Sequence, residues 1–249
     1  MAIWERQNKS RRKLHKKVRI QKNAMLLTND SPFAVKEAYV KLRTNLLFSM
    51  CANGERPCRV FAVTSPNPSE GKSLNAANIA VSFAMLGKKT LLIDADMRKP
   101  TQHKKWKIQQ TKGLSDLLAK IDVCPVYQVK DIPLSIICAG HVPSNPSELL
   151  SSVNMKTIID GAMKEFDYVV IDTPPINTVA DAQILMRIVD GAVLVVRAAS
   201  TKRPDVIHAL GLIEQAGGNL CGVVLNDINP KTGKKDYAYN YEYEYISQE

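Results

Sequence analysis

The hydrophobic and polar positions of this chain predict an ordered series of short strands and helices. Short apolar runs rich in branched residues, typical of buried strands, lie at 59–64, 90–95, 134–138, 168–171, 192–196 and 221–226. Apolar residues recur every three or four positions, as in helices with one buried face, over 31–48, 73–86, 155–165, 180–189 and 203–216. Because strands and helices alternate, we expect an α/β fold whose mostly parallel sheet is covered by helices on both faces.

The first residues of the chain depart from this pattern. Residues 1–22 contain nine Lys or Arg and one acid, so eight of the ten net positive charges of the chain lie there. A segment with so much charge and so little apolar surface predicts a disordered, flexible basic arm, which we place at 1–30. Attraction to an anionic membrane surface, nucleic-acid binding and mere solubility are three interpretations of this arm. No nucleic-acid-reading motif accompanies it, and we expect no nucleic-acid partner.

Length and composition limit the remaining possibilities. The 249 residues fit one domain, placed at 31–230, followed by a tail at 231–249. No apolar run approaches the roughly 18–20 residues that span a bilayer, and the N-terminus has no signal-peptide pattern. The five cysteines are scattered and odd in number, which favours reduced thiols in a cytoplasmic protein over disulfides or a zinc site.

The loop after the first predicted strand has the layout of a phosphate-binding P-loop (Walker A). Gly71, Lys72 and Ser73 follow a strand and a loop and open a helix, although Pro66 stands where a first glycine is usual. Backbone N–H groups of such a loop and of the helix N-terminus bind nucleotide phosphates. We expect Lys72 to reach the β- and γ-phosphates of ATP and the Ser73 hydroxyl to bind Mg²⁺. The predicted nucleotide-binding residues are Ser69, Glu70, Gly71, Lys72, Ser73, Leu74 and Asn226.

Acidic residues end two further predicted strands. Asp94 and Asp96 lie at the end of the second strand, and their i, i+2 spacing in an extended segment points both carboxylates the same way. Asp172 ends a later apolar run in a Walker B layout. Since ligands in parallel sheets bind at the carboxyl ends of the strands, we expect these carboxylates and Ser73 to surround one Mg²⁺ ion. An aspartate at a strand end is often only a helix cap, which is the alternative for Asp172 taken alone.

Two polar residues are weaker candidates. Asn226, at the end of the last strand, is placed either to hydrogen-bond adenine or to make a local turn. Glu148 is either a site residue or, together with Ser147, simply the start of a helix.

The last stretch of the chain carries five of its eight tyrosines, at every second position. They are Tyr237, Tyr239, Tyr241, Tyr243 and Tyr245, and residues 231–236 read as a flexible linker before them. If this segment is extended, the phenols line one face. Because the same chain contains a P-loop, the pattern favours tyrosines that accept phosphate on a flexible tail. An edge strand or a sticky aromatic tail is the alternative.

Together these segments resemble the bacterial tyrosine kinases of capsule and exopolysaccharide operons. The resemblance runs from about Val35 to Tyr245 and is specifically to the stand-alone cytoplasmic subunit found in Firmicutes. The stretches that carry it are Gly71-Lys72-Ser73, Asp94-x-Asp96-x-Arg98-Lys99-Pro100, Pro146-Ser147-Glu148-Leu149-Leu150, Ile171-Asp172-Thr173-Pro174-Pro175 and the tyrosine cluster.

The resemblance implies an ATP- and Mg²⁺-dependent protein-tyrosine kinase that first phosphorylates the tyrosine cluster of a neighbouring subunit. It implies that Asp94, Asp96 and Asp172 surround the metal and that Asp96, with Asp94 close behind, accepts the proton of the attacking phenol. Arg98 is then placed either to stabilise charge on the transferring phosphoryl group or to form a surface ion pair. Such a kinase regulates polysaccharide synthesis and export from the cytoplasmic face of the membrane. The implied partners are a transmembrane polysaccharide co-polymerase-like adaptor, a protein-tyrosine phosphatase and protein substrates of sugar-polymer synthesis.

The helix near the start of the domain, at 35–48, resembles the family's self-association motif Glu-x-x-Arg-x-x-Arg. Glu37 and Arg43 match this motif, but Val40 replaces its first arginine. The resemblance therefore implies a ring-like homo-oligomer of the chain's own subunits. A helix that packs only on its own domain is the alternative.

Two rival functions remain open. The first is an ATP-gated positioning or partitioning ATPase, but such proteins need a lysine four residues before Gly71, where Asn67 stands. The second is a weakly catalytic adaptor of the polysaccharide machinery. This second rival is favoured by Ser69 and Leu74, which replace a glycine and a threonine that are common in the family.

Overall fold

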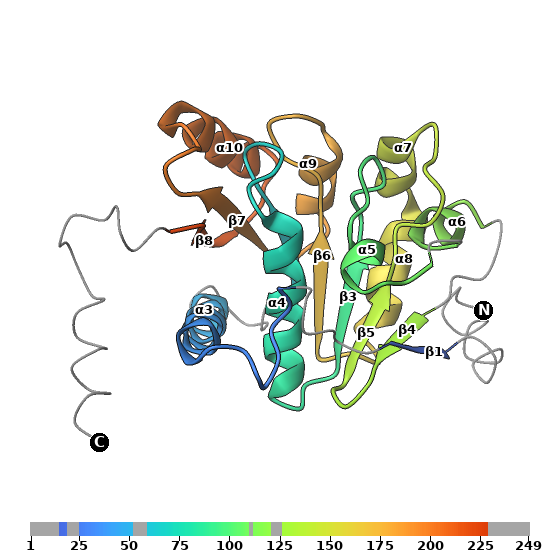
Figure 1. The fold of residues 1–249 in the computed structure, drawn as a ribbon. Helices are drawn as coiled ribbons and strands as arrows, with labels where there is room; N and C mark the ends of the chain where they lie inside the picture. Colours follow the sequence, from blue (N-terminus) through green and yellow to red (C-terminus); the bar gives the residue numbers. More distant parts are fainter. Residues whose placement is uncertain (1–14, 19–24, 52–58, 110–111, 121–125, 229–249) are drawn as a thin grey trace, which may run out of the picture.

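A mostly parallel sheet organises the part of the chain that the structure describes (Figure 1). This computed structural model describes residues 15–18, 25–51, 59–109, 112–120 and 126–228. Over these residues eight strands pair in the order β1-β4-β5-β3-β6-β2-β7-β8. They are β1 (His15–Val18), β2 (Val60–Thr64), β3 (Thr90–Asp94), β4 (Val126–Val129), β5 (Leu134–Ile137), β6 (Tyr168–Asp172), β7 (Gly191–Arg197) and β8 (Leu220–Asn226). Neighbouring strands are parallel except for the antiparallel pair β4 and β5.

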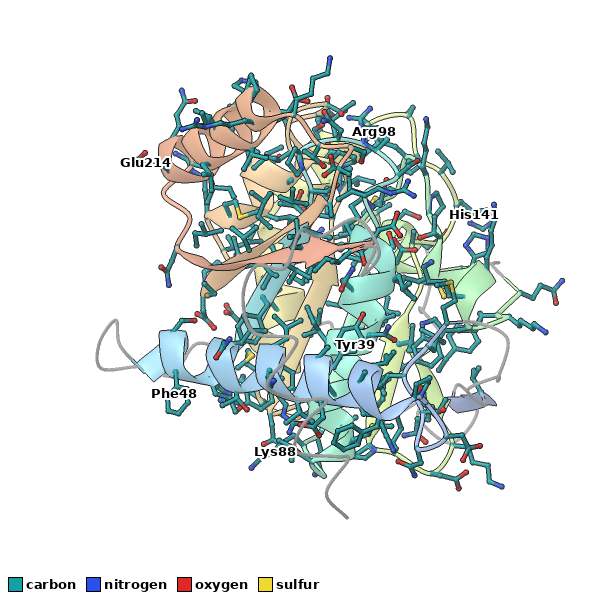
Figure 2. All side chains as sticks on the ribbon, turned by 60° about the vertical axis from the view of Figure 1, so that its left-hand side comes forward. Tyr39, Phe48, Lys88, Arg98, His141 and Glu214 are labelled. Carbon is teal, nitrogen blue, oxygen red and sulfur yellow. The ribbon has the colours of Figure 1, made fainter. Side chains whose placement is uncertain are left out.

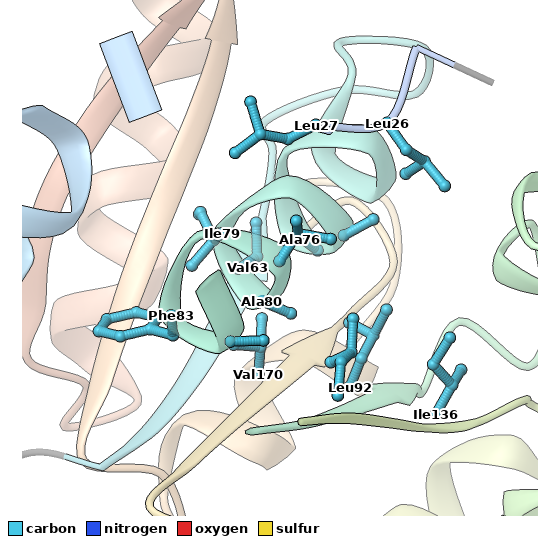
Figure 3. Packing of buried hydrophobic residues seen from close by; sticks show 14 of the residues in the cluster. Leu26, Leu27, Val63, Ala76, Ile79, Ala80, Phe83, Leu92, Ile136 and Val170 are labelled. Atoms are coloured by element: carbon cyan, nitrogen blue, oxygen red, sulfur yellow. The ribbon is translucent and has the colours of Figure 1, made fainter. Parts of the chain in front are cut away.

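Helices cover both faces of this sheet, as the alternation of strands and helices predicts. They are α3 (Phe33–Cys51), α4 (Lys72–Met85), α5 (Gln102–Lys105), α6 (Leu114–Leu118), α7 (Pro146–Ser151), α8 (Val153–Ala162), α9 (Asp181–Met186) and α10 (Arg203–Gln215). Leu92 of β3 packs in the core formed with α3 and α4 (Figure 3), whereas its neighbours Leu91 and Ile93 pack with α6 and α8. None of the described helices is long and apolar enough to cross a membrane.

Every strand and helix expected from the pattern is present, with ends that move by a few residues. The pattern missed β1, β4, α5 and α6, which are only four or five residues long. Elements this short contain too few positions for a period to be recognised. Helix α7 begins at Pro146, so Ser147 and Glu148 do lie at the start of a helix.

The prediction of a flexible basic arm over 1–30 is wrong for two parts of it. His15–Val18 forms β1, which pairs in parallel with β4 at the edge of the sheet. Leu26 and Leu27 are 5% and 3% exposed and belong to the core that α4 covers. The Leu27 N–H also donates to the buried Asn78 side chain of α4 at 2.8 Å. The leucine pair provides enough apolar burial to hold this stretch in place, and most of the arm lies outside the described residues.

Helix α3 packs along its own domain (Figure 2). Tyr39 accepts a hydrogen bond from Asn78 of α4 at 3.0 Å. Arg43 donates to the Ser82 carbonyl of α4 at 2.7 Å, and partial burial lowers the pKa of its guanidinium. The predicted self-association residue Arg43 is thus engaged within its own chain, whereas Glu37 is partly exposed on the same helix.

Replacing Leu27 by alanine should lower the free energy of unfolding by about 2–4 kcal/mol, because a buried leucine is lost and a cavity is left beside α4. Urea denaturation measures this change. The matched control is Met25→Ala, since Met25 is 78% exposed and should change the free energy by less than about 0.5 kcal/mol. Equal midpoints for the two variants would restore the flexible-arm interpretation for this stretch.

Candidate active site

The register of three adjacent strands brings the predicted site residues together. Strand β6 lies between β3 and β2, and Asp172 at its end pairs with Asp94 on one side and with Val63 on the other. The P-loop leaves β2 beside them, since β2 ends at Thr64 and α4 begins at Lys72. Strand pairing therefore places the P-loop and two carboxylates at one edge of the sheet, where ligands bind in such folds.

The P-loop depends on two residues in the left-handed backbone region. Ser69 and Gly71 have φ angles of 65° and 92°. This conformation costs a non-glycine residue about 1–2 kcal/mol of strain, which a glycine at position 69 would avoid. Asn226 at the end of β8 donates to the Glu70 carbonyl at 3.0 Å, and a Cβ on Gly71 would lie 2.1 Å from the Asn226 amide nitrogen. The residue predicted to bind adenine thus supports the P-loop, and its contact with adenine stays a prediction.

Glu70 is held in the same loop by its own side chain. It is only 4% exposed, and its carboxylate accepts a hydrogen bond from Thr201, just before α10, at 2.7 Å. Its other carboxylate oxygen has no hydrogen-bond partner among the described residues, and burial raises the pKa of Glu70. Thr201 and Asn226 therefore hold Glu70 from the side of β7 and β8. Glu70 thus helps to shape the loop, and its contact with a nucleotide stays a prediction.

Lys72 is the centre of the site. Its ammonium donates to Asp96 at 2.8 Å and to the Ser73 hydroxyl at 3.1 Å, and lies 3.5 Å from Asp172. Burial alone would lower the pKa of Lys72, but the carboxylates of Asp172 and Asp96 outweigh burial and raise it. Asp172 therefore faces Lys72 across the site, and the helix-cap alternative does not describe its contacts.

Asp94 has different hydrogen-bond partners from Asp96, although both carboxylates lie near the Lys72 ammonium. Its oxygens accept hydrogen bonds from the backbone N–H groups of Asp96 and Thr101, each at 3.2 Å, and of Gln102 at 3.0 Å. Burial and the nearby charge of Asp172 raise the pKa of Asp94 well above its usual value. Asp94 thus shapes the loop that carries Asp96, and its contact with a metal stays a prediction.

Two residues of α5 belong to the site and were missed from the sequence. The Gln102 amide donates to Asp172 and to the Ser73 carbonyl, both at 2.8 Å. Lys105 lines the cavity described below, and burial lowers the pKa of its ammonium. The only available signal was that both residues closely follow the Asp96 segment, because α5 is too short to show a helical period.

Arg98 forms an ion pair, which was one of its two interpretations. Its Nε and Nη2 donate to the two oxygens of Asp181 at 2.8 and 3.1 Å. Ser147 completes the group, since its hydroxyl donates to Asp181 at 2.6 Å and accepts from Arg98 at 3.0 Å. The Asp181 side chain has no exposed surface, whereas that of Arg98 is 40% exposed and borders the cavity. The pair is therefore anchored in the protein interior.

A cavity of about 420 Å³ opens above these groups. This volume lies in the range of about 300–1,000 Å³ that is usual for small-molecule sites. Its walls are the P-loop and the start of α4, the loop that carries Asp96, α5, and residues 174–179 after β6. Lys72, Arg98 and Lys105 bring positive charge to these walls, as binding of a polyphosphate requires.

The residues at the base of the cavity fit a Mg²⁺ ion. Three buried carboxylates, of Asp94, Asp96 and Asp172, lie around the Lys72 ammonium, and carboxylate oxygens are ligands that Mg²⁺ accepts. Within the described chain no three His, Cys, Asp or Glu residues form a ready metal cage. Mg²⁺ does not need such a cage, because it takes one or two carboxylates and completes its shell with water and phosphate oxygens.

Some predicted residues cannot be placed. The tail tyrosines Tyr237, Tyr239, Tyr241, Tyr243 and Tyr245 lie outside the described residues. Of the five cysteines, Cys138 and Cys221 are free thiols, as the scattered spacing predicts, while Cys58 and Cys124 also lie outside.

Comparison with known proteins identifies the family. A family profile described as ParA: NUBPL iron-transfer P-loop NTPase matches residues 58–242. The putative tyrosine-protein kinase CapB of Staphylococcus aureus is 40% identical over 219 residues, which cover 87% of this chain and 94% of CapB. The chain belongs to the bacterial tyrosine kinases. Tyrosine-protein kinase YwqD of Bacillus subtilis (strain 168) is also 40% identical to this kinase, over 84% of this chain and 87% of YwqD.

Solved structures agree with this assignment. The chimerical protein CapA2B2 is 34% identical, with a TM-score of 0.76 over 90% of this kinase and 99% of that chain. The cell division ATPase MinD of Pyrococcus furiosus is 20% identical, with a TM-score of 0.57 over 76% of this kinase and 79% of MinD. At that identity the second likeness shows the fold alone. This solved structure therefore supports the rival assignment to positioning ATPases only at the level of the fold.

Replacing Gly71 by alanine should weaken ATP binding by the kinase at least about tenfold, because the new Cβ strains the loop and displaces Asn226 from Glu70. Isothermal titration calorimetry measures the affinity. The matched control is Gly87→Ala: Gly87 has φ of 78°, but no atom lies within 4 Å of the added Cβ. This control should lose about 1–2 kcal/mol of stability and keep its affinity. Wild-type affinity in Gly71→Ala would refute the assigned role of the glycine.

Proposed function

We propose that this kinase transfers the γ-phosphoryl group of ATP to the tail tyrosines of a neighbouring copy and thereby regulates capsular or exopolysaccharide synthesis and export. The observation that carries the proposal is the Lys72 ammonium held between Asp96 and Asp172 at the base of the P-loop cavity. The proposed acceptors, which every copy of the chain carries in its tail, are Tyr237, Tyr239, Tyr241, Tyr243 and Tyr245.

Binding of ATP would use the P-loop and redistribute the contacts of Lys72. The N–H groups at the start of α4 and the Lys72 ammonium bind the phosphates. Because the triphosphate competes with Asp96 for this ammonium, binding frees the Asp96 carboxylate inside the cavity. Ser73 and Asp172 would hold Mg²⁺, with Asp94 behind them, and the ion supplies neutralisation of the phosphate charge.

Transfer then joins the phenol oxygen to the γ-phosphorus. The O–H bond of the acceptor tyrosine breaks, its proton passes to the freed Asp96 carboxylate, and ADP is the leaving group. The transition state is loose and its charge is spread, so alignment of the reactants and neutralisation of that charge contribute more than a strong base. Arg98 on the cavity wall would add positive charge at this stage.

The acceptor tail would come from another subunit of a ring-like homo-oligomer built through α3, with Glu37 and Arg43 at the contact. The exposed apolar side chains Phe33 and Phe48 of α3, 60% and 70% exposed, support an interface on this helix. Each phosphorylated tyrosine carries up to about two negative charges. Several of them on one tail would repel each other and acidic neighbours, so phosphorylation releases the tail and dissociates the oligomer.

The proposed activator is a transmembrane adaptor that resembles a polysaccharide co-polymerase. It would hold the cytoplasmic kinase at the inner face of the membrane. Two observations support a partner polypeptide. The first is that a similar solved structure is the chimerical protein CapA2B2. The second is that tyrosine-protein kinase wzc of Salmonella typhimurium matches 99% of this chain, but the match covers only 34% of wzc, so that protein contains further segments. A protein-tyrosine phosphatase would reverse the reaction. Proteins of sugar-polymer synthesis are the proposed further substrates.

Lys72→Met should lower tail phosphorylation by at least about a hundredfold, because the phosphates lose their principal cation. The measurement is mass spectrometry of residues 231–249 after incubation with Mg-ATP, with and without the cytoplasmic segment of a candidate adaptor. The control replaces all five tail tyrosines by phenylalanine, which should remove the tail phosphate and leave ATP binding unchanged.

Two results would redirect the assignment. Absence of tail phosphate with the adaptor present, despite measurable ATP binding, would favour the ATP-gated switch or the weakly catalytic adaptor. Phosphate that persists in Lys72→Met would show that another kinase added it.

Lys105→Met should raise the half-saturating ATP concentration about three- to tenfold, which is less than the effect of losing Lys72. The described residues offer Lys105 no ion-pair partner, and its ammonium lines the cavity, so a bound phosphate would gain one charge-assisted contact. Lys88→Met serves as a control, because Lys88 is an exposed residue of the turn before β3 and is absent from the cavity wall. Equal ATP dependence in both variants would remove Lys105 from the site.

A further inference from the structure

Gln102 links the three segments of the site through one buried residue. Its amide nitrogen donates to Asp172 Oδ2 and to the Ser73 carbonyl, each at 2.8 Å, and its backbone N–H donates to Asp94 at 3.0 Å. Gln102 has no exposed surface. A single residue thus contacts the ends of β3 and β6 and the first turn of α4.

Trp106 fixes which way the Gln102 amide points. The Trp106 indole nitrogen donates to Gln102 Oε1 at 3.2 Å, and Trp106 is itself only 2% exposed. Since the indole nitrogen can only donate, Oε1 must face Trp106 and the NH₂ group must face Asp172. The orientation of the amide therefore follows from the chemistry of its partners.

The consequence is a difference between the two oxygens of Asp172. Oδ2 is occupied by the Gln102 amide, whereas Oδ1 has no hydrogen-bond partner among the described residues and lies 3.5 Å from the Lys72 ammonium. A neutral amide suits this position, because it orients the carboxylate and leaves its negative charge available. A cationic donor there would compete with a metal for the same charge.

We propose that Gln102 is a positioning residue that keeps Asp172 Oδ1 available to Mg²⁺. The inference rests on the proposed function, in which Asp172 helps to hold the ion. Groups that orient a metal ligand through a hydrogen bond typically change metal affinity about tenfold to a hundredfold when they are removed. Gln102 touches neither nucleotide nor acceptor in this assignment, so its effect passes through Asp172.

The test measures binding of a fluorescent ATP analogue in EDTA and over a Mg²⁺ series. Gln102→Met keeps the length of the side chain and removes the donor. It should bind the analogue in EDTA within about twofold of wild type but need about ten- to a hundredfold more Mg²⁺ for half of the Mg²⁺-dependent gain in affinity. Asn78→Leu is the matched control, because it removes a buried amide whose hydrogen bonds go to Met25, Leu27 and Tyr39.

Trp106→Phe keeps an aromatic ring and removes the donor that orients the amide. It should raise the Mg²⁺ requirement by about three- to tenfold. If Gln102→Met does not fold, this variant alone tests the positioning role of Gln102. Asp172→Asn tests the proposed function itself and should lose most of the Mg²⁺-dependent gain.

The outcomes separate the two ideas. If Asp172→Asn loses the Mg²⁺ response while Gln102→Met and Trp106→Phe keep the wild-type response, the role of Gln102 is refuted and the metal site stands. If Asp172→Asn responds to Mg²⁺ like wild type, the metal site itself is refuted. An equal shift in Asn78→Leu would mean that Gln102 acts only through stability.

Discussion

The burial of one ammonium group among three carboxylates is the constraint on which the rest of the site depends. Lys72, Asp94, Asp96 and Asp172 are at most 7% exposed. Taking such ions out of water costs several kcal/mol for each, and attraction between them offsets the cost only with good geometry and further hydrogen bonds. The sheet supplies the geometry through the register of β3, β6 and β2. Backbone N–H groups and the Gln102 amide supply the donors, so the loop after β3 and helix α5 are parts of the site rather than connections.

Helix α4 carries the central lysine, and the chain holds it from the side opposite the sheet as well. Leu27 and Tyr39 bond to Asn78, and Arg43 bonds to the Ser82 carbonyl. The arm segment and α3 therefore form a brace for the helix whose first turn binds phosphate. A contact between subunits on α3 would lie only one helix away from the P-loop. This arrangement gives a physical route by which assembly can influence nucleotide binding.

The P-loop and Asp172 could be predicted because their chemistry depends on neighbours in the sequence and on the end of a strand. Gln102 and Asp181 could not, since their key partners lie 70 and 83 residues away and no local pattern specifies which partners they meet. The backbone donors that hold Asp94 lie seven and eight residues later in the chain, and no pattern in the sequence predicts them. The burial of Leu26 and Leu27 was not predicted, because the strongly basic residues before them dominate the composition of the segment. The strand series was readable because burial on both faces leaves continuous apolar runs.

The two interpretations of Arg98 are compatible once its hydrogen bonds are taken one by one. Leaving Asp181 without its partner would cost about 3–5 kcal/mol, because that carboxylate is fully buried. The ion pair, however, uses only Nε and Nη2, and no hydrogen bond to a described residue involves Nη1. A guanidinium holds five donors in one fixed plane, so Nη1 can donate to a phosphoryl oxygen while the pair persists. The contact that makes Arg98 look structural also holds its charge rigidly at the cavity wall, and rigid placement is what a loose phosphoryl transition state requires.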